Sequence, residues 1–184
     1  MPAVIREFRK NYPEVELILK ETSSEEVIAM VSAGDAEIGL VQAPIVRSLF
    51  DSGVLFEESF DLLVPAGHAL AKKSKTTMKE LSLEAFVLFK GRARTSVIEA
   101  AGKSGFEPRV ACESGEIQTV QALVAAGLGV AVLPEIASTP VSRQMVRLKL
   151  IRTIKRKVLW IARKGGSRSS AAVEFLKMCK EHSA

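Results

Sequence analysis

One short stretch gathers positive charge, hydroxyl groups and a glycine, and it is the best candidate for ligand chemistry in this sequence. It consists of Phe89, Lys90, Gly91, Arg92, Ala93, Arg94, Thr95 and Ser96. Glycine lets the backbone approach a ligand closely, and the start of a helix directs N–H groups at an anion. Arginine binds carboxylate or sulfate groups through paired hydrogen bonds. We therefore expect an anion-binding loop here. The alternative is that two of the three cationic side chains simply face solvent.

Polar or small residues stand at three more points, next to the ends of strand-like runs. They are Thr22 and Ser23, Gln42 and Ala43, and Glu116 and Ile117. The Gln42 amide can hydrogen-bond a ligand, although an ordinary loop at a strand end would carry the same residues. Ser23 and Glu26 are spaced as in a capping box, which would leave the Thr22 hydroxyl for a ligand. Ile117 would supply an apolar contact.

The reactive residue types form no catalytic or metal-binding pattern. His68 stands in a turn before Ala-Leu, His182 lies near the C-terminus, and neither belongs to a known nucleophile motif. Cys112 and Cys179 are far apart and lack metal-ligand spacing. Two reduced thiols are favoured over a disulfide, as in a reducing cytoplasm. We expect no catalytic residue, no metal and no cofactor.

The elements that position these loops alternate between helix-like and strand-like segments. Helical spacing covers 2–10, a segment that ends at Gly34, the short segment 82–86, about 95–104, 116–128 and the C-terminal segment. The strand-like runs are 15–20, 38–41, 60–64, 87–89, 109–113, 130–133, 146–150 and 157–162. This alternation predicts parallel-rich sheets with helices on both faces, and ligands in such folds bind beyond the carboxyl ends of the strands.

The composition indicates a globular chain. Its 184 residues are 47% hydrophobic and 26% charged, which is enough for one domain or two small lobes. No apolar run approaches the ~20 residues that span a bilayer. The N-terminal residues do not form a signal peptide.

Basic residues are concentrated between Glu135 and Glu174, where no acidic residue occurs. They are Arg143, Arg147, Lys149, Arg152, Lys155, Arg156, Lys157, Arg163, Lys164 and Arg168. Such a stretch can contact phosphates, but the interleaved apolar residues favour strands with one solvated face. No helix-turn-helix or zinc finger is present, so we do not expect this chain to read DNA directly.

Several motifs occur in the order and spacing of one family. Phe8–Leu17 reads as a helix that ends at Tyr-Pro, followed by a strand. Gly34–Val41 is similar to Gly-x-Leu-Asp-hydrophobic-Ala, with a glutamate replacing the aspartate, and Leu62–Ala71 has His before a small residue and Leu. Gly105–Arg109 and Leu123–Pro134 are also characteristic. Together these motifs cover nearly the whole chain, which resembles the effector-binding (regulatory) domain of LysR-type transcriptional regulators.

The resemblance implies an α/β fold of two Rossmann-like lobes joined by two crossover strands, similar to type 2 periplasmic-binding proteins. Lobe I would comprise 1–60 and 164–184, lobe II would comprise 61–163, and 60–64 and 157–162 would be the hinge strands. A small effector, expected to be anionic, would bind in the cleft between the lobes. Its contacts would be Thr22, Ser23, Gln42, Ala43, Phe89, Lys90, Gly91, Arg92, Thr95, Ser96, Glu116 and Ile117.

The sequence departs from the family pattern at its N-terminus. The family domain opens with a strand and a Ser/Thr-bearing loop before its first helix, whereas this chain begins at that helix. We therefore expect the first strand of lobe I to be absent, which would leave an exposed sheet edge or a gap. The winged helix-turn-helix of the family is also not in this chain, so DNA contact would belong to the parent protein.

The resemblance thus implies the effector-sensing domain of a cytoplasmic bacterial regulator. It would associate as a homodimer through lobe I and as a tetramer in the full-length parent, with no membrane partner. A solute-binding protein of a transport system shares the fold, but a signal sequence or lipoprotein cysteine would be expected. An enzyme such as a dehydratase would need an acid/base pair, and the candidate loops offer Lys, Arg, Gln and Thr instead.

Overall fold

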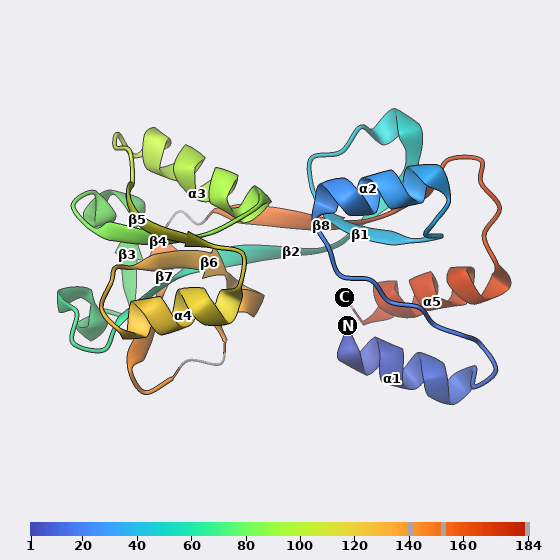
Figure 1. The fold of residues 1–184 in the computed structure, drawn as a ribbon, viewed down its shortest axis with the longest axis horizontal. Coiled ribbons are helices and arrows are strands. Elements are labelled where there is room, and N and C mark those ends of the chain that lie inside the picture. Colours follow the sequence, from blue (N-terminus) through green and yellow to red (C-terminus); the bar gives the residue numbers. More distant parts are fainter. Residues whose placement is uncertain (140–141, 152–153, 183–184) are drawn as a thin grey trace. The chain divides into compact units, whose positions relative to one another are not determined.

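The computed structural model describes residues 1–139, 142–151 and 154–182, and the chain divides into two compact units. Unit 1 contains 1–57 and 157–184, and unit 2 contains 58–156. Two long strands, β2 (Phe50–Pro65) and β8 (Lys155–Arg163), contribute residues to both units (Figure 1). The expected α/β fold with two connecting strands is confirmed. Unit 2 ends at residue 156, whereas lobe II was expected to end at residue 163. The division into functional lobes stays a prediction.

Unit 1 combines helices with the short strand β1. Its elements are α1 (Pro2–Asn11), α2 (Ser24–Ala33), β1 (Gly39–Gln42), the 3₁₀ turn η1 (Arg47–Leu49), α5 (Ser170–Glu181) and parts of β2 and β8. β1 pairs antiparallel with β8, and Leu40 lies opposite Trp160. The Ser23 hydroxyl accepts a hydrogen bond from Glu26 N (3.2 Å) at the start of α2, as predicted. Gly34, with a φ of 89°, ends that helix.

Unit 1 has two buried clusters, one around α2, β1 and β8 and the other, the α1–α5 core, between those two helices. Val4 and Phe8 are one helical turn apart and both are buried. Phe8 meets Phe175 of α5 edge to face, with ring centroids 5.1 Å apart. The predicted apolar face of α5 is confirmed, because Ala172, Phe175, Leu176 and Cys179 are all buried. Both cysteines are free thiols, and burial raises the pKa of the Cys179 thiol.

The prediction of a strand at 15–20 is wrong. This segment is extended but forms no ladder with any described residue. Val15 and Leu17 pack against the α1–α5 core, whereas Ile18 and Leu19 are 72% and 57% exposed. The alternation of apolar residues reflects this packing, and a strand also needs a neighbour to pair with.

Unit 2 contains two groups of strands with helices beside them. Its elements are the rest of β2, η2 (Ala69–Lys72), β3 (Lys75–Thr77), η3 (Met78–Leu81), β4 (Ala85–Phe89), α3 (Arg92–Lys103), β5 (Arg109–Ser114), α4 (Ile117–Ala125), β6 (Ala131–Pro134), η4 (Glu135–Ser138) and β7 (Met145–Ile151). β2 pairs antiparallel with β6 and β7. β3 pairs parallel with β7, and β4 pairs parallel with β5. Parallel pairing is therefore less prevalent than predicted.

Two predicted boundaries in unit 2 are corrected. Residues 82–86 are not helical, because Ala85 and Phe86 pair with Arg109 and Val110 in the β4–β5 ladder. Helix α3 begins at Arg92 rather than near residue 95, because Gly91 has a φ of 87° and turns the chain directly into the helix.

The unit 2 core encloses β4. Phe86 and Leu88 are fully or almost fully buried and pack with residues of β2, β6 and α3. The turn into β6 passes so close to β4 that Val130 N donates to Ala85 O (2.8 Å). A Cβ placed on Gly129 would lie 2.3 Å from that same Ala85 oxygen. This approach of two backbones explains the glycine before β6.

Gly129→Ala should therefore destabilise the protein by about 1–3 kcal/mol through overpacking. Gly102→Ala is the matched control, because Gly102 lies in α3 with open space around its Cβ position. In that helix, alanine should stabilise by up to about 1 kcal/mol. Urea unfolding of both variants measures the two effects, and a neutral Gly129→Ala would contradict the close approach.

A second prediction concerns Glu80 in η3. Its carboxylate accepts hydrogen bonds from Lys73 Nζ (2.8 Å), the Thr76 hydroxyl and Thr77 N (3.2 Å), which lower its pKa to about 2. Because the folded pKa lies below the unfolded value, these contacts stabilise the fold above about pH 4.5 and are lost toward pH 2.

The melting temperature of wild type should thus exceed that of Glu80→Gln most at neutral pH. The difference should shrink as the pH falls from 4.5 toward 2. The exposed Glu99 on α3 offers a control, Glu99→Gln, that should show no such trend. A difference that is constant with pH would contradict this assignment.

Candidate functional site

The predicted anion-binding loop lies at one edge of the β4–β5 pair. Because β4 and β5 run parallel and place Phe89 opposite Ser114, both strands end at the same edge of the sheet. Lys90 N donates to Ser114 O (2.9 Å), which extends the pairing by one residue. The loop after β4 and the loop after β5 are thus held side by side, as expected for the carboxyl ends of parallel strands.

Helix α3 starts within this loop and has no side-chain cap among the described residues. Its N-cap is Gly91, which has no side chain, and the backbone turn is closed by Arg94 N donating to Gly91 O (3.0 Å). Thr95 and Ser96 lie inside the helix rather than capping it, and the Ser96 hydroxyl donates to Arg92 O (3.3 Å). The orphan N–H groups of the first turn therefore face the loop.

The charges around this helix start partly cancel. Arg94 Nε lies 2.7 Å from Glu113 Oε1, so this arginine is committed to an ion pair. Lys90 is exposed and Arg92 is half-buried. Three cations and the two carboxylates of Glu113 and Glu116 leave a local net charge of +1. Lys90 and Arg92 are the other two cations of the loop, and their contact with an anion stays a prediction.

Helix α4 follows the end of β5 as α3 follows the end of β4. Its N-cap Glu116 makes no side-chain cap, and Glu116 N donates instead to the Ser114 hydroxyl (3.1 Å). Ile117, the first helical residue, packs against the buried cluster that includes Val87 and Val120. Phe89 also packs against that cluster. Their predicted apolar contacts with an effector stay predictions.

The unit 1 residues form a second group. Gln42 N donates to the Ser24 hydroxyl (3.2 Å), which joins the end of β1 to the start of α2 and so brings Gln42 near Ser23. The Ser23 hydroxyl is used by the helix cap. Ala43 N donates to Lys157 O (2.9 Å), so this amide is committed to β8.

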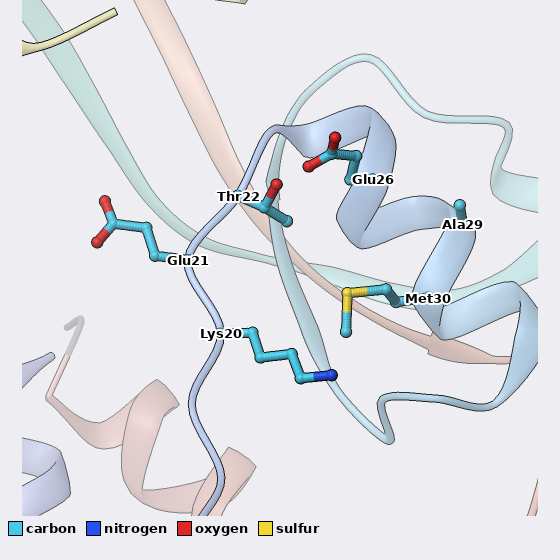
Figure 2. A pocket seen from close by; sticks show the side chains of 6 residues that line it. All are labelled: Lys20, Glu21, Thr22, Glu26, Ala29 and Met30. Atoms are coloured by element: carbon cyan, nitrogen blue, oxygen red, sulfur yellow. The ribbon is translucent and has the colours of Figure 1, made fainter.

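Thr22 belongs to the wall of a surface pocket of about 590 Å³ in unit 1. Figure 2 shows Lys20, Glu21 and Thr22 on the extended segment before α2, opposite Glu26 and Met30 on the helix. The extended segment has no strand partner, and this leaves the space between it and α2 open. Sequence reasoning missed the pocket because it predicted a paired strand at 15–20. The pocket wall includes Lys20, the last residue of that segment, which is unpaired in the structure.

The twelve predicted effector contacts thus fall into two groups. Unit 1 holds Thr22, Ser23, Gln42 and Ala43, and unit 2 holds Phe89, Lys90, Gly91, Arg92, Thr95, Ser96, Glu116 and Ile117. In unit 1 the bond from Gln42 N to the Ser24 hydroxyl joins two of the segments, and in unit 2 the bond from Lys90 N to Ser114 O does so. That one effector touches both groups stays a prediction.

Five of the ten basic residues after Glu135 form ion pairs with acidic residues of β2. The pairs are Arg147 and Lys149 with Asp61, Arg156 with Glu58, Lys157 with Glu57, and Arg168 with Asp51, and Arg152 lies outside the described residues. These contacts favour the interpretation that the basic stretch forms strands with paired charges rather than a phosphate-binding surface. The signal was present in the sequence, since residues 51–61 carry four carboxylates on a neighbouring strand.

The histidines serve structural contacts. His68 Nδ1 accepts from Leu70 N (3.2 Å) and its Nε2 lies 3.2 Å from Glu84, whereas His182 Nε2 lies 3.0 Å from Glu7. Within residues 1–139, 142–151 and 154–182, no three His, Cys, Asp or Glu residues cluster as metal ligands would. In the same residues, no helix combines the length and apolar character needed to cross a membrane.

Comparison with solved structures agrees with this fold. The regulatory domain of CcmR from Synechocystis PCC6803, solved with 2-PG, has a TM-score of 0.89 at 21% identity and covers 99% of this chain and 90% of its own. The effector-binding domain of BenM with its effector benzoate has a TM-score of 0.86 at 19% identity, over 99% of this chain and 85% of its own.

Comparison with known sequences identifies the family. The transcriptional dual regulator GltC of Bacillus subtilis (strain 168) is 34% identical over 139 residues, which are 73% of this chain and 46% of GltC. The chain spans about half the length of the curated relatives it matches. The family model of the LysR substrate binding domain matches residues 1–184. The chain therefore belongs to the LysR substrate-binding domain family.

Proposed function

We propose that this domain senses a small anionic effector and thereby controls transcription by a LysR-type regulator. The observation that carries the proposal is the carboxyl end of the β4–β5 pair, where α3 and α4 both start, with no side-chain cap among the described residues. Lys90 and Arg92 lie at this end. Uncapped helix N-termini favour negative charge, and a nearby guanidinium can bind a carboxylate with two hydrogen bonds.

The comparisons support an effector of this class. Benzoate, the effector named for BenM, is a carboxylate, and relatives such as GltC are transcriptional regulators. These relatives favour a regulator domain over a transport protein. Unit 1 would add polar contacts from Thr22, Ser23 and Gln42.

In this proposal the effector acts by binding one arrangement of the regulator more tightly than another. It can shift that equilibrium only by its differential affinity for the two arrangements. DNA contact would come from a winged helix-turn-helix of the parent protein in the bacterial cytoplasm. The domain would pair as a homodimer through lobe I, within a tetrameric parent.

We further propose that the domain is not an enzyme. The candidate loop carries cations and hydroxyl groups, and the neighbouring carboxylate of Glu113 on β5 is held in an ion pair with Arg94. Incubation with the tightest ligand found, followed by product analysis, tests this proposal, because an enzyme would convert the ligand.

The effector class can be tested by thermal shift. The panel consists of benzoate, shikimate, aliphatic carboxylates, phosphate and sulfate, with benzamide as the neutral counterpart of benzoate. An anion present at 100 times its Kd should stabilise the fold by about 2.7 kcal/mol. If benzamide and other neutral compounds alone raise the melting temperature, the effector is not an anion.

Arg92→Ala should weaken binding of such an anion about tenfold or more, because a hydrogen bond between charged groups contributes roughly 1.5–3 kcal/mol. Lys103→Ala, at the far end of α3, is the matched control and should leave the Kd unchanged. Isothermal titration calorimetry measures both. Equal affinities of wild type and Arg92→Ala would remove Arg92 from the site.

A further inference from the structure

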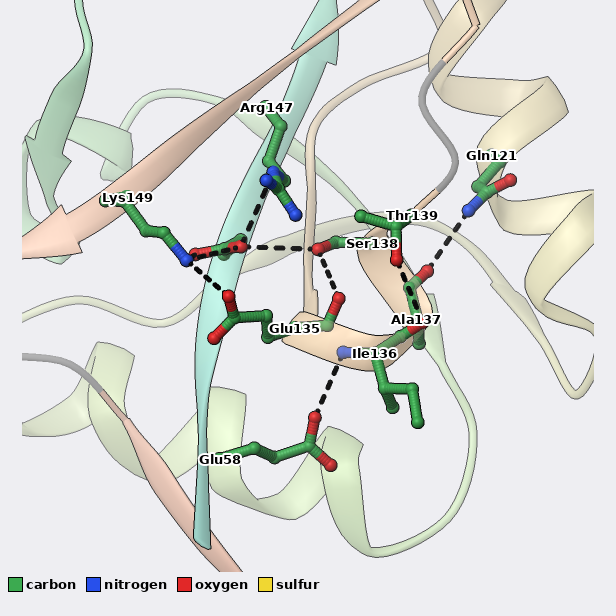
Figure 3. A network of polar contacts seen from close by, with 10 residues as sticks. Glu58, Gln121, Glu135, Ile136, Ala137, Ser138, Thr139, Arg147 and Lys149 are labelled. Atoms are coloured by element: carbon green, nitrogen blue, oxygen red, sulfur yellow. Dashed lines mark hydrogen bonds and ion pairs between the residues drawn. The ribbon is translucent and has the colours of Figure 1, made fainter. Parts of the chain in front are cut away.

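The 3₁₀ turn η4 is attached to α4 on one side and to β2 on the other. Gln121 Nε2 of α4 donates to Ala137 O (3.1 Å), and Ile136 N donates to Glu58 Oε2 of β2 (3.1 Å). Figure 3 shows the two contacts at successive residues of η4, with Gln121 and Glu58 reaching it from different elements. A short polar chain thus leads from α4 through η4 to β2.

Glu58 continues this chain to β8. Its second oxygen, Oε1, accepts from Arg156 Nε (2.7 Å), and Arg156 Nη2 lies 2.5 Å away. The Glu58 side chain is only 8% exposed. A carboxylate removed from water in this way depends on its partners, because its burial is costly without them. Both oxygens of Glu58 are committed, one to η4 and the other to β8.

The position of this pair in the chain gives it a wider role. Glu58 is the first residue of unit 2 on β2, and Arg156 is its last residue on β8. The next residues, Glu57 and Lys157, form a second ion pair of 2.8 Å that is about half exposed. An exposed pair contributes little. The buried Glu58–Arg156 pair is therefore the stronger connection between β2 and β8 where the chain passes from one unit to the other.

Other contacts make η4 a firm link. The Ser138 hydroxyl donates to Asp61 Oδ2 (3.3 Å). Lys149 Nζ lies 2.9 Å from Glu135 Oε1 (Figure 3). Lys149 Nζ also lies 3.2 Å from the fully buried Asp61. Residues Ile136 and Ser138 of η4 are thus bonded to β2, and Glu135 is bonded to β7.

At the α4 end, this series of polar contacts begins beside the candidate effector site. Ile117, a predicted effector contact, and Gln121 are four residues apart in α4, so they lie on the same face of the helix. A displacement of the helix start therefore reaches Gln121 within one turn. From there it reaches Glu58 through two backbone groups of η4.

We propose that Glu58 is a positioning residue, which couples the start of α4 through η4 to β2 and β8 at the unit boundary. The proposal deepens the proposed function and rests on it for its physiological input. Glu58 does not touch the effector. It transmits the position of α4 to the two strands that both units share.

The experiment measures amide hydrogen exchange in the 184-residue chain without any ligand. Gln121→Leu keeps the helix but removes the bond to Ala137 O, and it should raise exchange at residues 57–58 and 156–157 several-fold. Gln118→Leu, an exposed position on the same helix, is the matched control and should leave those amides unchanged. A merely local role of Gln121 would change only α4 and η4.

Glu58→Gln tests the link itself. The amide oxygen can still accept from Ile136 N, but the charge that holds Arg156 is lost, so exchange at 156–157 should rise. In this background Gln121→Leu should add no further increase there. If Glu58→Gln does not fold, Arg156→Lys replaces it, since lysine keeps the charge but loses the two-nitrogen contact.

Wild-type exchange at 57–58 and 156–157 in Gln121→Leu would overturn the proposal. So would an effect of Gln121→Leu that is equally large with and without Glu58→Gln. Because no ligand is present, a failed anion screen overturns the proposed function without touching this result. Conversely, an anion that binds while exchange stays local overturns only the coupling.

Discussion

Strand β2 carries four carboxylates that meet the basic residues of the last third of the chain, and much of the structure depends on this pairing. Asp61 is fully buried, with Lys149 Nζ 3.2 Å and Arg147 Nε 3.7 Å away, although its Oδ1 has no well-aligned hydrogen bond among the described residues. Burying such a group is costly unless opposite charge compensates it. The ion pairs thus reinforce the backbone pairing of β2 with β7. Strand β2 also runs through both units, so it is one of the two strands that connect them.

Helices with a clear apolar face were predictable, since burial follows their periodicity. The face of α5 that contains Phe175 and Cys179 is an example. Segment 15–20 shows the limit of this reasoning, because the same apolar alternation serves packing against helices when no neighbouring strand is present. The start of α3 was missed because Gly91 replaces the usual side-chain cap, and serine or threonine further along looked like the better signal. Local patterns identify which face is buried, whereas pairing depends on residues far away in the sequence.

In the candidate site, too, local patterns were predictable and contacts with residues distant in the sequence were not. The alternation of strands and helices placed the loops after β4 and β5 at one edge, and the parallel pairing of Phe89 with Ser114 agrees with it. The charge of the loop was not predictable, because Arg94 is committed to Glu113 from the neighbouring strand. Similarly, the basic stretch after Glu135 suggested a phosphate-binding surface in the sequence, but in the fold it lies beside β2, whose carboxylates pair with part of it. Side chains that look available in the sequence are often the ones that a neighbouring strand uses.

The way each helix begins connects the fold to the proposed site. In unit 1, α2 and α5 satisfy their first N–H groups with Ser23 and Ser169, and α1 begins with a proline, which has no N–H to satisfy. In unit 2, α3 and α4 begin without side-chain caps, at the edge where Lys90 and Arg92 are found. A capped helix has less to gain from a ligand, because its own side chain already occupies the N–H groups. The first N–H groups of the uncapped helices α3 and α4 can still bind a ligand. Helix α4 is also the helix that contacts η4 through Gln121. In the proposed function, the same helix would receive an anion at its first turn and would pass on its displacement one turn later.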